Sequence, residues 1–471
     1  MIHNRNWKVM NVRTCATCKR PRWLIVCGMF LLWAAVALPA QTFTLLQSFD
    51  GYDGYGSEAA LVQGTDGNFY GDTINGSVFG EGNVYKTTPS GTVTSLHMFS
   101  SSDGVEPVGA LVLDTNGKFY GTTSYSGSTL WGSVFSITSG GTVTTVHGFV
   151  NSDGAYPEGP IVQASNGSLY GICRYAGPTG YGGTIFEITP AGTFNTFYAF
   201  AEDGGSTPLY GLIQGTDGSL YGISQSGGLG YGGIYKVDQG ATLTLLYSLT
   251  NGSDGSGPQG PLVQAANGNF YGTTSGAGVY GYGTVFGMSP TGTLHTLHSF
   301  DSTEGANPAA GLIQATDGNF YGTTSAGGAN GNGTIFQMTP TGTLTTLHNF
   351  DGTDGNDAQA PLVQGTDGNF YGTTYTGGAS NIGTIFNESV GLGPFVRTNP
   401  TSGAAGKTVK ILGNNLTGST SVTFNRVEAA FTIASNSAII ATVPAGATTG
   451  TVQVTAPGGT LNSNIVFRVR P

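Results

Sequence analysis

The chain has 471 residues, of which 80 are glycine, 9% are charged and 38% are hydrophobic, and its formal net charge is −10. Glycine at this level without a Gly-X-Y period excludes collagen, and the hydrophobic content is too high for a disordered chain. Short strands separated by glycine-rich turns fit the composition, so we expect an all-β protein with at least two domains.

Residues 1–40 have the form of a secretory signal peptide. Six basic and no acidic side chains accompany the apolar run Trp23–Leu38, and small residues allow cleavage after Ala37 or Ala40. An uncleaved membrane anchor is the alternative, although the run is short for a membrane span. We therefore expect a secreted or cell-surface protein, with the periplasm as a further location.

The cysteines give the mature chain no disulfide. Cys15, Cys18 and Cys27 lie in the presequence, and a start at Met10 instead of Met1 would keep all three. Only Cys173 remains after cleavage, so intramolecular disulfides are excluded. The stability of the mature protein must come from packing.

One phrase, GTDGNFYG or a close variant, returns seven times with a period near 50 residues. Its tyrosines are Tyr70, Tyr120, Tyr170, Tyr221, Tyr271, Tyr321 and Tyr371, which mark repeats 1 to 7. A fixed period of this length is typical of a propeller or a repeat array.

Each repeat contains four strand-like runs, as Gly311–Phe350 shows. GLIQA is followed by an Asp-Gly hairpin turn, then by NFYGTT, a glycine-rich loop, GTIFQM, a Pro-Thr-Gly turn and TLTTLHNF. In the recurring phrase we expect the Phe or Leu and the Tyr to pack between repeats, and the final Gly to permit close approach. The phrase is thus interpreted as scaffold and not as a catalytic motif.

The two ends of the repeat region complement each other. Residues 42–49 read TFTLLQSF, which matches a fourth strand, whereas the last repeat runs through Gly383–Ser389 and then lacks one. We therefore predict a seven-bladed β-propeller over residues 41–390, in which the N-terminal strand completes the last blade.

The repeats resemble the tandem repeat called GloVer, found in exported bacterial proteins described as choice-of-anchor. The resemblance rests on [LI]-[VI]-Q-x-x-[DN]-G-x-[FL]-Y-G followed by G-T-[IV]-F and P-x-G, and it covers residues 42–390. The family name implies a variable C-terminal anchor, but no apolar tail or sorting signal precedes Arg470-Pro471, so attachment to the surface stays open. The resemblance implies no activity and no site residues.

After a linker at residues 391–393 the period stops, and residues 394–471 read as a small immunoglobulin-like β-sandwich of short alternating runs. This tail closely resembles an IPT/TIG domain. The residues that carry the resemblance are Pro400, Gly403, Gly406, Val409–Gly413, Asn414 to Leu416, Val422 to Asn425, Val443-Pro444, Gly450–Val454 and Pro457 to Gly459.

Charge divides unevenly between the two regions. Residues 41–393 hold four basic and 25 acidic side chains, a net charge of −21, whereas residues 394–471 hold six basic and one acidic side chain, a net charge of +5. Nucleic-acid binding by the repeats is excluded, because it needs positive charge to displace counterions. We expect a monomer without a transmembrane segment in the mature chain.

The variable loops emerge on one propeller face, where binding usually lies. Before strand 1 each loop carries an acid followed by glycine: Asp53, Asp103, Asp153, Asp203, Asp254, Glu304 and Asp354. Three interpretations stay open for these acids, namely turn formation, Ca²⁺ coordination and ligand contact. The Ca²⁺ candidates are Asp50, Asp53, Asp351 and Asp354, and no other cofactor is expected.

Aromatic residues and one arginine in these loops are the ligand candidates. They are Trp131, Tyr175, Tyr181, Tyr231, Tyr280, Tyr282, Tyr375 and Arg174. They either pack between glycine-rich loops or stack on a sugar or protein partner. Arg174 lies in GICRYAG, the one segment whose sequence departs strongly from the equivalent segments of the other repeats.

Other recurring polar residues are interpreted as structural. His97, His147, His298 and His348 share one strand-4 position and are not expected to be catalytic. A glutamine recurs in strand 1 of every repeat except repeat 2, which has Leu113; these glutamines either line the channel or cap backbone groups.

No catalytic constellation emerges from the sequence. We expect a non-enzymatic binding or structural protein of the bacterial envelope that presents its loop face to a glycan or protein. The alternatives are a hydrolase or lyase acting on polysaccharide, and surface architecture without a ligand. Convergence of two or three carboxylates outside the regular repeat pattern would favour the enzyme.

Overall fold

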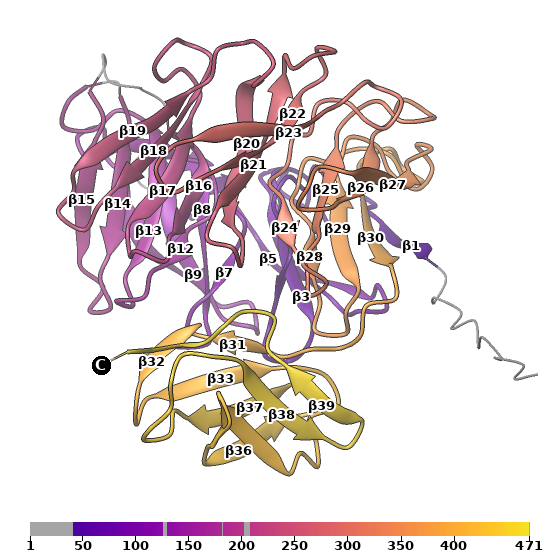
Figure 1. Ribbon diagram of the computed structural model, residues 1–471. Helices are drawn as coiled ribbons and strands as arrows, with labels where there is room; N and C mark the ends of the chain where they lie inside the picture. The colour runs from indigo at the N-terminus through magenta and orange to yellow at the C-terminus, as the bar shows by residue number, and fades with distance from the viewer. Residues whose placement is uncertain (1–40, 126–129, 181, 202–207, 471) are drawn as a thin grey trace, which may run out of the picture. The chain divides into compact units, whose positions relative to one another are not determined.

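The computed structural model describes residues 41–125, 130–180, 182–201 and 208–470 (Figure 1). All of them belong to one compact unit, Pro39–Pro471. The signal-peptide prediction and Tyr181 lie outside the described residues. Within the described part every regular element is a β-strand, as the sequence predicted.

Each repeat folds into its own antiparallel sheet. Repeat 1 forms β2 (Val62–Gln63), β3 (Phe69–Thr73), β4 (Asn83–Thr87) and β5 (Val93–Met98). Repeat 2 forms β6 (Val105–Pro107), β7 (Val112–Leu113), β8 (Phe119–Tyr125), β9 (Ser133–Ile137) and β10 (Val143–Gly148). Repeat 3 forms β11 (Ala155–Pro157), β12 (Val162–Gln163), β13 (Leu169–Tyr175), β14 (Thr184–Ile188) and β15 (Phe194–Ala199).

The later repeats follow the same order. Repeat 4 forms β16 (Pro208–Gln214), β17 (Leu220–Ser224), β18 (Gly233–Val237) and β19 (Leu243–Ser248), and repeat 5 forms β20 (Ser256–Gln264), β21 (Phe270–Gly276), β22 (Thr284–Met288) and β23 (Leu294–Ser299). Repeat 6 forms β24 (Ile313–Gln314), β25 (Phe320–Thr324), β26 (Thr334–Met338) and β27 (Leu344–Asn349). Repeat 7 forms β28 (Val363–Gln364), β29 (Phe370–Thr374) and β30 (Thr384–Ser389).

The fourth strand of the last sheet comes from the other end of the repeat region, as predicted. β1 (Thr42–Ser48) pairs antiparallel with β30, with Thr42 opposite Ser389 and Ser48 opposite Thr384 (Figure 1). Phe43 of β1 also stacks on His348 of repeat 6, with ring centroids 3.7 Å apart.

Two sheets contain one strand more than the four expected. In repeats 2 and 3 the segment before strand 1 forms β6 and β11, which pair with the ends of the seven-residue strands β8 and β13. In repeats 4 and 5 the corresponding segment merges with strand 1 into the long strands β16 and β20, each with an irregular register. The loop face is therefore more ordered than the sequence suggested.

The recurring phrase joins neighbouring repeats through aromatic stacking. Tyr70 stacks on Phe119 of repeat 2 with centroids 4.1 Å apart, and Tyr321 stacks on Phe370 of repeat 7 at the same distance. Tyr371 of repeat 7 stacks on Phe69 of repeat 1 at 4.0 Å. The predicted packing role of this phrase is thereby confirmed.

The glycine after each tyrosine leaves room for a strand-3 aromatic ring. A Cβ at Gly372 would lie 2.4 Å from Cζ of Phe386, and a Cβ at Gly222 would lie 2.4 Å from Oη of Tyr235. A side chain at either position would displace the buried ring, so the expected close approach is present.

The strand-1 glutamines join successive repeats through side-chain hydrogen bonds to the backbone. Gln264 Nε2 donates to Gly268 O at 3.0 Å, and Gln264 Oε1 accepts from Thr216 N of repeat 4 at 2.8 Å. Between the last and first repeats, Gln63 Oε1 accepts from Thr366 N at 3.0 Å. Of the two roles considered for these glutamines, the capping of backbone groups is the one observed.

Leu113, which replaces the glutamine in repeat 2, has a different partner. It belongs to a buried cluster that includes Leu412 of the C-terminal region, and its carbonyl accepts a hydrogen bond from Asn399 Nδ2 at 3.0 Å. Ser437 Oγ likewise donates to Thr65 O at 2.8 Å. The gap in the glutamine series therefore lies where the C-terminal domain packs.

The C-terminal domain is a β-sandwich with its own buried core, which includes Val409, Ile411, Val422, Phe424 and Phe467. One sheet has the order β31 (Arg397–Asn399), β33 (Thr408–Leu412), β37 (Ala438–Thr442) and β36 (Phe431–Ser435). The other has the order β35 (Val427–Glu428), β34 (Ser421–Phe424), β38 (Val452–Ala456) and β39 (Gly459–Asn462). β32 (Ser402–Ala404) pairs in parallel with β40 (Arg468–Arg470).

Candidate functional site

Three aromatic side chains from repeats 2 and 3 meet around the ring of Tyr156. The Tyr156 ring lies edge-on to Tyr125, Trp131 and Tyr175, with centroids 5.0, 6.1 and 6.0 Å away. We call Tyr125, Trp131, Tyr156 and Tyr175 the tyrosine patch. The side chains of Tyr125 and Tyr175 are 45% and 37% exposed, so the patch offers ring surface to solvent.

The backbone positions the tyrosine patch through the two additional strands. Val105 of β6 lies opposite Tyr125, and Ala155 of β11 lies opposite Tyr175. Tyr156 N donates to Trp131 O at 3.1 Å. Tyr156 has a φ of 55°, and the equivalent residues Gly56, Glu106, Gly257, Asn307 and Asp357 also have positive φ values, so this conformation is a feature of the repeat backbone.

Arg174 links the tyrosine patch to a carboxylate. Its guanidinium carbon lies 5.1 Å from the Tyr175 ring centroid, which is within cation–π range. Nη1 donates to Glu158 Oε2 at 3.2 Å, and Nη2 donates to Gln225 Oε1 of repeat 4 at 3.2 Å. Arg174, the residue singled out by its deviating repeat, therefore does converge with an acid.

Glu58 lies within electrostatic range of three carboxylates from other repeats, Glu106, Glu158 and Asp357. We call Glu58, Glu106, Glu158 and Asp357 the acid cluster. Burial raises the pKa of Glu58, and the charges of Asp357, Glu158 and Glu106 raise it further. Repeats 2, 3 and 7 thus each place a carboxylate whose charge acts on Glu58 of repeat 1.

Burial also raises the pKa of the other three carboxyls. At Glu158, Arg174 opposes this effect, and at Asp357 a hydrogen bond from Gln359 opposes it. Glu106 and Asp357 have positive φ values of 55° and 59°, as Tyr156 does at the equivalent position.

Tyr375 and Tyr210 lie beside the acid cluster. Burial raises the pKa of Tyr375, and the charge of Glu58 raises it further. Burial likewise raises the pKa of Tyr210, with a further contribution from Glu158. Of the predicted ligand candidates, Trp131, Arg174, Tyr175 and Tyr375 therefore lie at or next to one site.

The other described candidates do not join it. The side chains of Tyr231, Tyr280 and Tyr282 are exposed and form no ring contact with the patch in the part of the chain that the structure describes.

The acid cluster was missed because its members lie outside the Asp-Gly loop motif. The sequence did carry a signal for these acids, namely variation of the residue type at two positions of the repeat, the third and the fifth after the loop acid. One carries Gly56, Glu106, Tyr156, Gly257, Asn307 and Asp357, and the other carries Glu58, Val108, Glu158, Gln259, Ala309 and Gln359.

Asp203 lies outside the described residues, and Asp53, Asp103, Asp153, Asp254 and Asp354 accept hydrogen bonds within their own loops. Asp53 Oδ1 accepts from Asp50 N at 2.8 Å, and Asp354 Oδ1 accepts from Asp351 N at 2.9 Å. Backbone hydrogen bonds lower the pKa of Asp50, and a hydrogen bond from the Thr353 hydroxyl lowers that of Asp351. Burial raises the pKa of Asp53. Among the described residues no group of three or more His, Cys, Asp and Glu side chains is arranged to hold a metal, and Ca²⁺ binding by these four acids stays a prediction.

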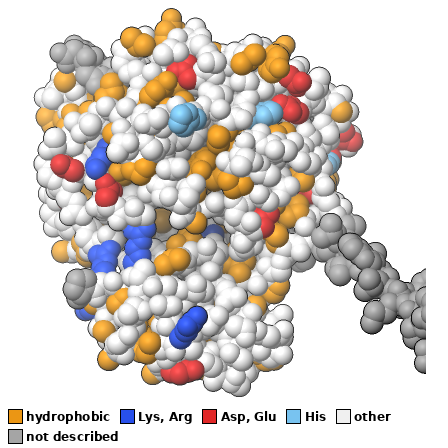
Figure 2. All heavy atoms as spheres, viewed as in Figure 1, with side chains coloured by type: hydrophobic (Ala, Val, Ile, Leu, Met, Phe, Trp, Pro, Cys, Tyr) orange, Lys and Arg blue, Asp and Glu red, His pale blue; other side chains and the backbone are white. Residues whose placement is uncertain are grey.

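The strand-4 histidines pair with these loop acids, which the sequence did not reveal. His97 Nε2 lies 2.8 Å from Asp103 Oδ2, and His348 Nε2 lies 2.8 Å from Asp354 Oδ2. His147 of repeat 2 pairs with Asp153, and His298 of repeat 5 pairs with Glu304. Figure 2 shows histidines close to acidic side chains on the surface of the repeats. The signal in the sequence was the constant spacing of six residues between each histidine and its acid. The pairing indicates that these contacts hold the loops in place.

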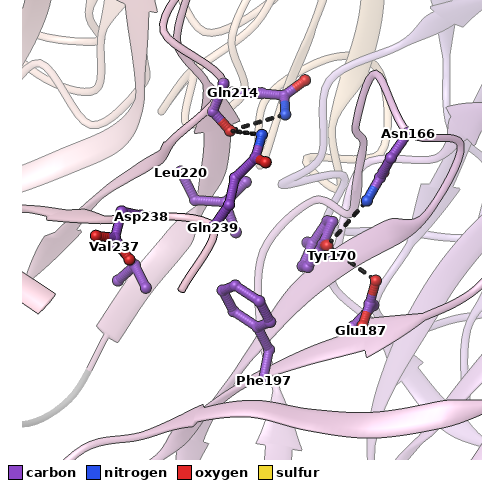
Figure 3. A pocket seen from close by; sticks show the side chains of 10 residues that line it. Asn166, Tyr170, Glu187, Phe197, Gln214, Leu220, Val237, Asp238 and Gln239 are labelled. Atoms are coloured by element: carbon purple, nitrogen blue, oxygen red, sulfur yellow. Dashed lines mark hydrogen bonds between the residues drawn. The ribbon is translucent and has the colours of Figure 1, made fainter. Parts of the chain in front are cut away.

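One hollow lies elsewhere, between repeats 3 and 4 (Figure 3). It has a volume of about 260 Å³. Tyr170 Oη donates to Glu187 Oε1 at 2.9 Å, and Gln214 Nε2 donates to Gly218 O at 2.9 Å. Because its polar groups bond to one another, this hollow is a seam between repeats, and the tyrosine patch and acid cluster remain the better candidate site.

Comparison with protein families supports both parts of the chain. The model described as the Gloeobacter/Verrucomicrobia repeat matches residues 35–230 and 208–425. The chain belongs to this repeat family. The IPT/TIG domain matches residues 395–469, so the resemblances drawn from the sequence are confirmed. No curated protein matches significantly.

Solved structures show only distant similarity to this chain. The extracellular domain of a protein described as a hybrid two-component system, from B. thetaiotaomicron, is 14% identical with a TM-score of 0.49, covering 91% of this chain and 55% of that one. The repeat-family chain thus spans about half the length of that structure. The periplasmic gluconolactonase of Pseudomonas aeruginosa is 16% identical with a TM-score of 0.43, covering 62% of this chain and 84% of that one. Likenesses this weak carry no argument about function.

None of the described residues forms a helix that is long and apolar enough to cross a membrane.

Proposed function

We propose that this chain is an extracellular binding protein that holds a glycan at the tyrosine patch and the adjoining Arg174–Glu158 pair. Rings set edge to edge with exposed faces suit the apolar faces of sugars, and an arginine–carboxylate pair suits their hydroxyl groups. The arrangement of Tyr125, Trp131 and Tyr175 around Tyr156 is the observation that carries the proposal.

The scaffold of this proposal is a closed seven-bladed propeller over residues 41–390. It is supported by the β1–β30 pairing, the Tyr371–Phe69 stack and the Gln63–Thr366 hydrogen bond, which join the first and last repeats. Residues 391–393 link the ring to the sandwich at 394–471. Export through the presequence and a monomeric state belong to the same proposal.

A glycan array followed by titration tests the binding function. The full mature chain, beginning at Gln41, should bind a subset of glycans and quench or enhance Trp131 fluorescence. Replacing both Tyr125 and Tyr175 by alanine should weaken binding at least tenfold, since each stacked ring contributes about 1 kcal/mol or more.

The matched control is Tyr280→Ala, which removes an exposed loop tyrosine outside the patch. It should bind as the unaltered protein does. Equal loss in both variants, or no glycan bound at all, would overturn the proposal and direct attention to a protein partner.

A hydrolase or lyase acting on polysaccharide is the second candidate. The observation that favours it is the convergence of four carboxylates outside the Asp-Gly loops, with pKa values raised by burial, because a raised carboxyl pKa suits a general acid. Release of reducing ends or unsaturated products from a bound polysaccharide, lost in Glu58→Gln and Glu158→Gln, would establish it. Binding without turnover would leave the protein a non-enzymatic binder.

A further inference from the structure

The strands β31 and β33 of the sandwich turn one face toward the repeats. Residues directly opposite each other on antiparallel strands share a face, and here Arg397 lies opposite Leu412 and Asn399 lies opposite Lys410. Leu412 belongs to the same buried cluster as Leu113 of repeat 2, and Asn399 Nδ2 donates to Leu113 O at 3.0 Å. Arg397 and Lys410 therefore lie on the face that packs against the repeats.

Repeat 2 places a second lysine beside Lys410. A Cβ built on Gly117, in the hairpin turn of repeat 2, would lie 3.1 Å from Lys410 Nζ, so the ammonium group lies against this turn. The next residue of the turn is Lys118, which is exposed. The equivalent residues of the other six repeats are all asparagine or serine. The lysine thus occurs only in the repeat whose turn contacts Lys410.

Arg468 adds a further cation at the same boundary. Its Nη1 donates to Thr216 O of repeat 4 at 3.3 Å, and its backbone N donates to Thr401 O at 3.0 Å, two residues after Asn399. Figure 2 shows Lys and Arg side chains close together where the sandwich meets the repeats. We call Lys118, Arg397, Lys410 and Arg468 the basic junction.

The basic junction has no counter-charge in the part of the chain that the structure describes. None of its four side chains forms a salt bridge there. The acids of the two neighbouring turns already have partners, since Asp114 accepts from Gln163 and Asp217 pairs with Lys236 at 2.7 Å. Glu428, the one acid of the sandwich, accepts from a serine of its own sheet.

Arg397 is the member of the basic junction that most needs an anion. Its side chain is only partly exposed, and its guanidinium forms no hydrogen bond or salt bridge with any described residue. Burial lowers the pKa of Arg397, and no charged group contributes to this shift. A cation that is withdrawn from water without a partner is unfavourable, so an anion from outside the chain would remove a cost.

The charge of the surroundings favours a narrow anionic chain over a membrane surface. Residues 41–393 have a net charge of −21. An anionic bilayer is broad and would also face these acids, which would repel it. A single polysaccharide chain can contact the basic junction alone. Its carboxylate groups match the two parallel N–H donors of an arginine.

We propose that the basic junction binds the carboxylate groups of an acidic polysaccharide and so tethers the protein non-covalently to the envelope. Arg397 and Arg468 hold the carboxylates, and Lys118 and Lys410 supply further positive charge. This site shares no residue with the tyrosine patch, so the inference does not depend on the proposed glycan-binding function.

A pair of oligosaccharides that differ in charge tests the inference. The full mature chain is titrated with the hexamer of 1,4-linked α-galacturonic acid and with its uncharged methyl ester. The acid form should bind about tenfold more tightly or better, because the ester cannot form the charge-assisted hydrogen bonds. Added salt should narrow the difference. Equal affinity for the two hexamers would overturn the inference.

Variants locate the binding site. Lys410→Gln combined with Arg468→Gln should abolish the preference for the acid form. The matched control combines Lys86→Gln with Arg426→Gln, which removes the same charge elsewhere and should keep the preference. Thermal unfolding of each variant confirms that it is folded. A preference that survives the first pair of substitutions, or is lost equally in the control, would overturn the inference.

A milder variant keeps the test valid if the first pair disturbs folding. Lys118→Asn copies the residue that repeats 1, 5, 6 and 7 carry in an exposed turn. It should weaken binding of the acid form about threefold, in line with the contribution of an exposed ion pair. Unchanged binding in this variant would exclude repeat 2 from the site and contradict the proposed junction.

Failure of this inference and failure of the proposed function look different. Replacing Tyr125 and Tyr175 by alanine should leave binding of the galacturonate hexamer intact, and its loss would place the hexamer on the tyrosine patch and overturn the inference. Binding to phosphatidylglycerol vesicles without binding to the hexamer would make the junction a membrane contact and also overturn it. If the hexamer binds through Lys410 and Arg468 but no glycan uses the tyrosine patch, only the proposed function is wrong.

Discussion

Repeats 1 and 6 have the same sheet order but treat buried polar groups differently. In repeat 6, Thr323 donates to a carbonyl of the next repeat, and Phe336 fills the interior without a polar atom. In repeat 1, the same two positions hold Asp72 and Tyr85, and their carboxyl and hydroxyl oxygens have no partner among the described residues. Repeat 6 shows that the scaffold needs neither group, so repeat 1 bears an energetic cost that repeat 6 avoids.

Exchanging the residue at this position between the repeats should give the largest effect. Thr323→Asp should destabilise the protein by about 3 kcal/mol, because it buries a carboxyl where a satisfied hydroxyl stood. The reciprocal Asp72→Thr should raise the unfolding temperature. Thermal unfolding of both variants checks this, with Thr323→Val as the control that removes only the hydroxyl. If both exchanges were neutral, repeat 1 would bear no cost and the contrast would fail.

Repeat 7 contains a second buried acid whose cost depends on pH. Glu388 is fully buried, and burial raises its pKa to about 7, whereas the equivalent residues of repeats 5 and 6 are Met288 and Met338. The folded state therefore holds a proton that the unfolded state releases above about pH 4.3. Stability is lost as the pH rises from there through 7.

Glu388→Met should therefore stabilise the protein by roughly 3 kcal/mol at pH 8, since each pKa unit corresponds to about 1.4 kcal/mol. The gain should shrink steadily as the pH falls toward 4.5. Unfolding temperatures of the two proteins between pH 4.5 and 8 measure it. A gain that does not vary with pH would show that packing and not ionisation is responsible.

The smallest effect on stability is expected for the strand-1 glutamines that join successive repeats. Gln264→Leu copies Leu113 into repeat 5 and leaves Thr216 N without its acceptor. Arg468 of the sandwich donates to Thr216 O at 3.3 Å, a bond that does not involve the Gln264 side chain. We expect a loss of about 1 kcal/mol, measured by urea unfolding. Leu113→Gln provides the comparison, since it should cost more by displacing Leu412 contacts. Similar losses in the two variants would mean that Leu113 has no special role.

The sequence predicted what each repeat does alone and for its nearest neighbour. The periodic sequence pattern predicts the strand order and the packing role of Phe and Tyr in the recurring phrase. It also predicts the pairing of Thr42–Ser48 with the last repeat. β6 and β11 were not foreseen, because residues such as Glu106 and Tyr156 carry no strand pattern and gain strand structure by pairing with lengthened neighbours.

The candidate site depends on residues from repeats far apart in the chain. Arg174 and Tyr175 stood out as deviations, but Glu58 and Asp357 are 299 positions apart and their proximity follows only from three-dimensional packing. The His–acid pairs were within reach of the sequence, since both partners recur at fixed spacing.

The pairing of β1 with β30 also sets an order of events during synthesis. β1 is made first, and its partner emerges only after six repeats have been completed. At a synthesis rate of about 5–20 residues per second, the first strand stays unpaired for some tens of seconds. Its exposed edge is then a place where another chain can bind, so a chaperone that shields residues 42–48 would protect newly made protein from aggregation.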